Sequence, residues 1–170
     1  IAWACRFARA NRDVLAARAV EVLAEALGCE PEPGASVDVH HNYVEEETHL
    51  GRVLLVHRKG AVGLEAGQRG LIPGSMGTAS YVVEGRGAPL AFRSCSHGAG
   101  RVLTRSEARA RIRPAALEQA LRRVVFDRGR MEALVEEAPA AYRDIAEVLE
   151  DEADLVSPVL RLTPIAVLKG

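Results

Sequence analysis

A single histidine beside a glycine-rich turn is the strongest chemical feature of this 170-residue sequence. His97 follows Ser96 and precedes Gly98-Ala99-Gly100, and Arg101 closes the turn. Glycines let the backbone approach a ligand closely, and consecutive N–H groups in such turns form a concavity that binds anions. Arginine can grip a phosphate in a bidentate manner, and the imidazole can carry a proton, bind a metal or act as a nucleophile. The stretch indicates a phosphate site, although a glycine turn with a surface histidine has the same pattern.

A second polar stretch combines imidazole, amide and carboxylate groups. His40-His41-Asn42 is followed by Glu45-Glu46-Glu47 and by His49. Imidazole and carboxylate ligands suit a divalent ion such as manganese or zinc. A structural or surface pair of histidines is the alternative. The three glutamates are expected to form a solvated face and not a ligand set.

Two further stretches could contact phosphates or a nucleotide. His57-Arg58-Lys59 places three potentially cationic groups together, as an RNA phosphate or a triphosphate would favour. A charged strand end is the alternative. Pro73-Gly74-Ser75-Met76-Gly77 predicts a rigid turn with open backbone donors and a hydroxyl group, which would suit part of a nucleotide. An ordinary loop would have the same composition.

The elements between these stretches indicate an α+β fold with a mixed β-sheet core flanked by helices. Apolar residues at helical spacing up to Leu27 predict a helix that Gly28 ends. The capping-box pattern of Thr104 to Glu107 predicts a helix that runs to about Arg113. Gly63, Gly67 and Gly70 punctuate a hairpin-like region. We expect strands at residues 36–40, 53–56 (buried), 81–83, 90–92, 124–126 and 159–168, a loop at Pro31, Pro33 and Gly34, and helices from Pro114 to about Arg123 and over residues 145–149.

Composition and charge restrict the classes of protein further. The sequence has no apolar run of about 18 residues and no basic-plus-apolar leader, so a membrane protein is not expected. Three cysteines without metal-type spacing favour a reducing cytoplasm. The net charge is only −1, but arginines predominate between Arg101 and Arg130, which is compatible with contact to an RNA backbone. A solvated arginine-rich surface is the alternative. The chain begins with Ile1 in a helical run without a cap, so upstream sequence is expected to be missing.

The order of these motifs resembles that of the RtcB-family RNA ligases. The resemblance rests on residues 41–45, 57–61, 73–81 and 96–101 and on the terminal Lys169-Gly170. It covers essentially all of residues 1–170 but only the C-terminal part of the family's length. It therefore implies the C-terminal portion of one catalytic domain, with the upstream part missing.

The resemblance also implies an activity and a set of site residues. Family members join RNA ends with a 3′-phosphate or 2′,3′-cyclic phosphate to 5′-hydroxyl ends, in tRNA splicing or RNA repair, with GTP and manganese; archease can activate them. His97 would become guanylylated, and His41, directly before Asn42, would bind metal. The resemblance assigns nucleotide contacts to His41, Asn42, Pro73, Gly74, Ser75, Met76, Ser80, Gly98, Ala99, Gly100 and Lys169.

The resemblance has a departure that leaves other functions open. The Asp, Cys and further His ligands of the family's two-metal site lie upstream and have no counterpart here, so this portion alone is expected to be inactive. A non-catalytic nucleotide- or RNA-binding fragment and a metal-dependent phosphohydrolase that uses His97 as acid or base are the alternatives. Cys95 is expected to be a small packing residue, and a buried final strand is expected to project Lys169 into the site.

Overall fold

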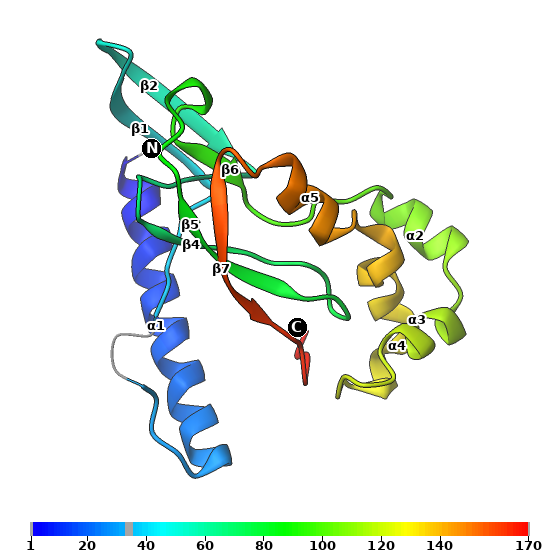
Figure 1. Cartoon of the computed structure of the whole chain (residues 1–170). Coiled ribbons are helices and arrows are strands. Elements are labelled where there is room, and N and C mark those ends of the chain that lie inside the picture. Colours follow the sequence, from blue (N-terminus) through cyan, green and yellow to red (C-terminus); the bar gives the residue numbers. More distant parts are fainter. Residues whose placement is uncertain (1, 33–35, 170) are drawn as a thin grey trace.

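The computed structural model describes residues 2–32 and 36–169 and confirms the α+β class (Figure 1). The helices are α1 (Ala2–Leu27), α2 (Arg105–Arg111), α3 (Pro114–Ala120), α4 (Met131–Leu134) and α5 (Ile145–Asp151), with short 3-10 turns η1 (Pro89–Ala91), η2 (Arg128–Arg130), η3 (Val135–Glu137) and η4 (Pro139–Ala141). The strands are β1 (Asn42–His49), β2 (Arg52–Lys59), β3 (Ala61–Gly63), β4 (Arg69–Ile72), β5 (Ser80–Gly85), β6 (Ser94–Ser96) and β7 (Val156–Leu162). Pro33 and Gly34 of the expected loop lie outside the described residues.

The described strands pair antiparallel in three small sheets, β1–β2, β3–β6 and β4–β5–β7. Leu50 and Gly51 join β1 to β2, and their φ angles of 50° and 76° suit a two-residue hairpin turn. β3 pairs with β6 and not with β4, so the expected hairpin around Gly63, Gly67 and Gly70 is wrong. The pairing of β3 with β6 matters for function because Ser96, at the end of β6, directly precedes His97.

The helix predicted for the first residues is confirmed, but its apolar residues are not in the core. Gly28 ends α1 with a φ of 64°, and its N–H donates to the Ala24 carbonyl at 2.9 Å. No described residue of α1 is buried, and Figure 1 shows the helix along one side of the molecule, away from α2–α5. Among the described residues no helix, α1 included, is long and apolar enough to cross a membrane.

Several strand predictions before residue 100 are wrong. Residues 36–40 form no strand, so His41 and Asn42 lie at the beginning of β1 and not at the end of an earlier strand. Residues 90–92 lie in and after the 3-10 turn η1, because Pro89 begins that turn and Phe92 has a φ of 49°. The strand at 53–56 is confirmed as part of β2, but Val53 and Leu55 are exposed since their two-stranded hairpin has an uncovered face.

Predictions for the second half are confirmed only in part. Thr104 and Glu107 form the capping box of α2, which ends at Arg111. Residues 124–126 form one isolated bridge, between Val125 and Ala166, instead of a strand. β7 ends at Leu162, and Leu168 is 96% exposed. The expected buried strand up to residue 168 is therefore wrong, because Ile165 and Leu168 are exposed and, of the apolar side chains after β7, Val167 alone packs against a described hydrophobic cluster.

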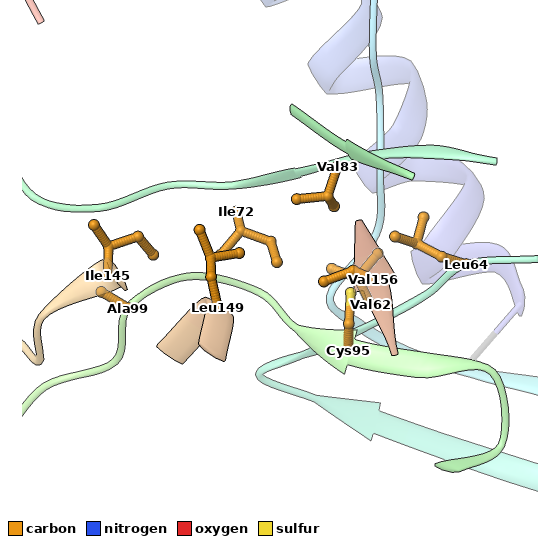
Figure 2. Packing of buried hydrophobic residues seen from close by; sticks show 9 residues of the cluster. All are labelled: Val62, Leu64, Ile72, Val83, Cys95, Ala99, Ile145, Leu149 and Val156. Atoms are coloured by element: carbon orange, nitrogen blue, oxygen red, sulfur yellow. The ribbon is translucent and has the colours of Figure 1, made fainter. Parts of the chain in front are cut away.

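Two hydrophobic clusters hold the strands and the later helices together. The first joins β3–β7 to α5 and contains Val62, Leu64, Ile72, Val83, Cys95, Ala99, Ile145, Leu149 and Val156 (Figure 2). Its Cys95 is a packing residue, as expected. The second packs α3 and α4 together and contains Met76, Leu117, Leu121, Leu134, Val135 and Ala138. Each cluster includes a residue of a predicted site loop, Ala99 in the first and Met76 in the second, so the core fixes the positions of those loops.

The buried guanidinium of Arg58 joins the β1–β2 hairpin to β6. Arg58 is 5% exposed and forms an ion pair with Glu47 on the neighbouring strand. It also donates to the Tyr43 hydroxyl at 3.1 Å, the Ser94 hydroxyl at 3.0 Å and the Phe92 carbonyl at 2.8 Å. Arg58 is therefore a structural residue inside the protein, and the expectation that it faces a phosphate is wrong. The expectation that all three glutamates form a solvated face is also wrong for Glu47.

Replacing Glu47 by Gln should destabilise the protein in a pH-dependent way. The hydrogen bond from Arg58 is the main reason that the pKa of Glu47 is lowered from 4.5 to about 2. A lowered carboxyl pKa stabilises the folded state above pH 4.5, and this contribution is lost as the pH falls toward 2. We expect Glu47→Gln to lower the free energy of unfolding by about 2 kcal/mol near neutral pH. Urea unfolding at a series of pH values measures the difference.

Glu46→Gln is the matched control, since Glu46 lies next to Glu47 on β1 and is exposed. It should change the free energy of unfolding little at any pH. An equal loss in both variants, or a Glu47→Gln difference that does not shrink below pH 4.5, would contradict the ion-pair explanation.

Candidate functional site

His97 and His41 lie side by side although 55 residues separate them in the sequence. Their rings stack with centroids 5.2 Å apart and planes inclined by 25°. His41 directly precedes β1, and His97 directly follows β6. The two histidines that the sequence singled out for metal binding and for nucleophilic attack therefore belong to one site.

Gly60 connects these two histidines. It follows β2 with a φ of 72°, and its N–H donates to the His41 carbonyl at 2.8 Å. A Cβ placed on Gly60 would lie 3.4 Å from Cε1 and 3.5 Å from Nδ1 of His97. The next residue, Ala61, pairs with Ser96 in the β3–β6 sheet. Gly60 thus contacts the backbone of His41 and lies beside the Nδ1–Cε1 edge of His97.

The loop after His97 packs against Pro73. The Ala99 N–H donates to the Pro73 carbonyl at 2.9 Å, and the Ala99 side chain is buried in the first cluster. A Cβ on Gly98 would lie 3.1 Å from the same carbonyl oxygen, so the contact needs glycine. The expected row of consecutive free donors is therefore wrong at Ala99. Within residues 36–169, the N–H groups of Gly98 and Gly100 have no protein acceptor and remain able to bind a ligand.

A glutamate that sequence reasoning missed holds the residue before His97. Glu152, the C-cap of α5, accepts hydrogen bonds from the Ser96 N–H at 2.8 Å and from the Ser96 hydroxyl at 3.1 Å. Glu152, Asp151 and Arg143 line an open pocket of about 300 Å³ together with His97 and its glycine loop. No local signal distinguishes Glu152 within its acidic stretch. Only the packing of α5 against β6 reveals its role.

The loop predicted to cradle a nucleotide uses its own donors internally. The Gly74 N–H donates to the Ser80 hydroxyl at 3.3 Å, and the Ser75 N–H donates to the Thr78 hydroxyl at 2.7 Å. The Met76 side chain is buried in the second cluster. The expectation of open backbone donors at Gly74 and Ser75 is therefore wrong. The loop is instead a rigid support that places Pro73 against the His97 loop.

Arg101 and Lys169 meet at one carboxylate on the far side of the loop. Arg101 donates to the Tyr142 hydroxyl at 3.0 Å and forms an ion pair with Glu137 at 3.4 Å. Lys169 lies 3.3 Å from the same Glu137 carboxylate. Burial opposes ionisation of Glu137, but the Tyr142 hydroxyl and Lys169 keep its pKa below the usual value. Arg101 is thus engaged within the protein but also lines the pocket of His97, and its expected grip on a phosphate stays a prediction.

The surroundings of His41 favour the protonation state that a metal ligand needs. Burial, followed by the charges of His97, Arg12 and His40, lowers the pKa of His41 and favours the neutral imidazole. Its neighbour His40 is engaged elsewhere, 3.0 Å from the Arg12 guanidinium and edge-on to Tyr43. Within the described residues, no three His, Cys, Asp or Glu side chains gather as a metal-binding group. His41 therefore fits a metal as one ligand of a larger set.

Asn42 and the exposed residues of the His57–Lys59 stretch lie beside His41. Asn42 opposes Lys59 in the β1–β2 register, and Val44 opposes His57. Asn42, His57 and Lys59 line an open cavity of about 730 Å³ together with His41. The cationic stretch thus contributes one buried structural arginine and two exposed side chains that can meet a ligand.

Replacing Glu152 by Ala should loosen the backbone that carries His97. The Ser96 N–H would lose a charged acceptor worth about 1.5 to 3 kcal/mol. We expect the Ser96 amide to exchange about 10 to 100 times faster, as measured by hydrogen exchange with NMR. Glu152→Gln, which retains a carbonyl acceptor, should preserve most of the protection. Asp151→Ala is the control at the same pocket, and faster exchange of Ser96 in that variant would contradict the assignment.

Comparison with known proteins places these motifs in a family. A family model described as "tRNA-splicing ligase RtcB" matches residues 1–170. The chain is 39% identical over 176 residues to the RNA-splicing ligase RtcB of Escherichia coli K12, and the match covers 100% of the chain and 42% of that protein. It is 38% identical over 191 residues to the RNA-splicing ligase RtcB of Mycobacterium tuberculosis, covering 100% of the chain and 44% of the relative.

An archaeal relative is equally similar. The tRNA-splicing ligase RtcB of Pyrococcus furiosus is 39% identical over 194 residues, which cover 98% of the chain and 20% of that protein. The chain thus spans less than half the length of these relatives. Because the family model matches residues 1–170, and because two of the motifs that carry the resemblance meet at the His41–His97 pair, the chain belongs to the RtcB family.

Proposed function

We propose that this chain provides the guanylylation site of an RNA ligase. The full protein would join RNA ends bearing a 3′-phosphate or 2′,3′-cyclic phosphate to 5′-hydroxyl ends, with GTP and manganese. The observation that carries the proposal is the stacking of His97 on His41, with Gly60 beside both residues. Membership of a family whose relatives are named RNA-splicing or tRNA-splicing ligases supports it.

His97 is the nucleophile in this proposal. Its Nδ1–Cε1 edge faces Gly60, which leaves Nε2 to attack the α-phosphorus of GTP. A P–N bond forms, the P–O bond to pyrophosphate breaks, and GMP remains on His97 as a phosphoramidate. The RNA 3′-phosphate then takes GMP from His97, and the 5′-hydroxyl displaces GMP as the new phosphodiester forms. The covalent intermediate divides one difficult substitution into easier steps.

The residues around His97 would bind and orient the nucleotide. The free N–H groups of Gly98 and Gly100 can donate to phosphate oxygens. The side of the site next to the His97 loop would be shaped by Pro73, Gly74, Ser75, Met76, Ser80 and Ala99. Met76 and Ala99 would do so through packing in the core. Asn42 would contact the nucleotide from β1. Lys169 would contact the nucleotide from its position beside Glu137, where its ammonium group lies 3.3 Å from the carboxylate.

His41 would hold manganese together with ligands from outside the described residues. Bound manganese would withdraw charge from the phosphates and orient them. Imidazole suits this ion, and the lowered pKa of His41 keeps a nitrogen lone pair free. A second metal would need further ligands, so we expect the 170-residue chain alone to be inactive. We further propose that the full protein acts in RNA splicing or repair in the cytoplasm and that archease activates it. The free thiols of Cys5, Cys29 and Cys95 support the cytoplasmic location, because thiols stay reduced there.

Incubation of the full-length protein with GTP and manganese should attach GMP to His97. Intact mass measurement followed by peptide mapping locates the adduct. We expect His97→Ala to abolish it and His40→Ala to retain most of it. The His40 variant is the control because it removes another imidazole near the site, and that imidazole contacts Arg12 and Tyr43.

The outcomes separate the proposal from the other two functions. An adduct that persists in His97→Ala or maps to a lysine would refute the assignment of His97. Binding of GTP or RNA without any adduct would indicate a non-catalytic binding protein. Release of phosphate from RNA ends without an adduct would indicate a phosphohydrolase.

His41→Ala should weaken manganese binding in the full-length protein about 10- to 100-fold, the range typical of the loss of a ligand's support. His40→Ala should have much less effect, because its side chain contacts Arg12 and Tyr43. Metal titration monitored by calorimetry measures both. Equal losses of manganese affinity in the two variants would contradict the assignment of the metal ligand to His41 rather than to His40.

A further inference from the structure

The arginines between residues 101 and 130 divide into two groups. Five of them are ion-paired: Arg101 with Glu137, Arg105 with Glu136 and Glu137, Arg109 with Glu136, Arg111 with Glu107, and Arg128 with Glu118. The other four, Arg113, Arg122, Arg123 and Arg130, have no carboxylate partner among the described residues, and Arg130 donates to the Lys169 carbonyl. The basic segment is therefore only partly neutralised within the protein, and two of its unpaired arginines, Arg122 and Arg123, are adjacent after α3.

Arg122 and Arg123 line a hollow with two arginines from other parts of the chain. Arg143 precedes α5, and Arg161 lies on β7 opposite Tyr81 of β5. Together these four arginines line a pocket of about 690 Å³. Neither Arg143 nor Arg161 forms an ion pair within residues 2–32 and 36–169, and Arg161 donates only to the Thr163 hydroxyl, at 3.1 Å.

The charge of this pocket is not balanced from within. Asp144 is the one acidic residue among those that line it, and its carboxylate caps α5 by accepting from the Ala146 N–H at 2.8 Å. Four guanidinium groups that face one hollow repel one another, and a polyanion that replaces their counterions relieves this repulsion. Guanidinium groups also match the geometry of phosphate oxygens. The pocket is thus built for an anion with several phosphates.

The arginine pocket and the His97 pocket share Arg143 as a lining residue. The backbone N–H of Arg143 donates to the Gly100 carbonyl at 3.0 Å in the loop after His97. A chain of phosphates with its end at His97 can therefore extend past Arg143 toward Arg122, Arg123 and Arg161.

We propose that the pocket lined by Arg122, Arg123, Arg143 and Arg161 binds the phosphodiester backbone of a single RNA strand whose end is positioned at His97. The identity of the strand as RNA rests on the proposed function, whereas the polyanion site rests on the charges of the pocket and on Arg143, which lines both pockets. The strand is single because chemistry at an RNA end requires that end to be free of its partner. The contacts are to phosphates, so binding should be independent of base sequence.

The test compares two double variants of the full-length protein. Arg122→Gln/Arg123→Gln removes two unpaired charges, and Arg109→Gln/Arg128→Gln removes two ion-paired charges from the same segment. Fluorescence anisotropy with a labelled single-stranded RNA of about ten nucleotides gives the affinity at several salt concentrations. Each lost phosphate contact should reduce the slope of log K against log salt by about 0.7.

We expect the first variant to lose about 1.4 from this slope and the second to lose almost nothing. The affinity advantage of the unchanged protein over the first variant should then shrink about sevenfold between about 50 and about 200 mM salt. Equal slopes in the two variants would overturn the proposal. Thermal unfolding of both variants confirms that they are folded, and Arg161→Gln, with an expected loss of about 0.7, provides an independent single-site check.

Two further measurements identify the anion and separate this proposal from the guanylylation of His97. If the first variant forms less GMP adduct in the absence of RNA while its RNA slope is unchanged, the pocket serves the free nucleotide and the proposal fails. Weaker binding of polyglutamate with unchanged RNA binding would assign the pocket to an acidic protein and also overturn it. A reduced RNA slope with normal adduct formation supports it. If no adduct forms even in the unchanged protein, the guanylylation proposal fails and the slopes still decide the polyanion site.

Discussion

The candidate site depends on one buried positive charge. Arg58 lies on β2, but its guanidinium reaches Tyr43 and Glu47 on β1, Ser94 on β6 and the carbonyl of Phe92. A buried guanidinium is tolerated only where carboxylate and hydrogen-bond acceptors surround it, so these segments must keep their relative positions. Because β1 begins after His41 and β6 ends before His97, this requirement also fixes the two histidines relative to each other.

The loops around His97 are held mainly by their own backbone. Gly60 donates to the His41 carbonyl, Ala99 donates to the Pro73 carbonyl, and Glu152 accepts from Ser96. These contacts anchor the loop at Ser96 and Ala99. The free N–H groups of Gly98 and Gly100 are therefore placed by a framework that is already satisfied. A ligand that binds these N–H groups meets a preorganised loop and does not have to order it, which favours tight binding. The same preorganised donors can stabilise negative charge that develops on a phosphate during a reaction.

Charge pairing decides which basic residues are available to a ligand. Arg58 and Arg101 are close to the proposed chemistry, but each is engaged by a glutamate. The arginines of α2 are likewise paired with carboxylates of η3 or of their own helix. Positive charge remains free where the chain after α3, the start of α5 and β7 surround one hollow. A net charge of −1 is thus compatible with a positive pocket, because the charges of the chain are unevenly distributed and four arginines line this one hollow.

The sequence by itself determined the features that local chemistry controls. The first helix and its glycine end, the capping box at Thr104, the α+β class and the candidate phosphate loop at His97 all follow from residue type and spacing, whereas His41 was singled out by the resemblance to the family. Only the tertiary structure decided which side chains are free to act. Arg58, Glu47 and Met76 have the residue types of ligands or a motif position, but packing and ion pairing hold them inside the protein. Arg101 lines the His97 pocket but is paired with Glu137. Glu152 gains its role because α5 happens to lie against β6, a contact that pairs residues 56 positions apart and leaves no local pattern in the sequence.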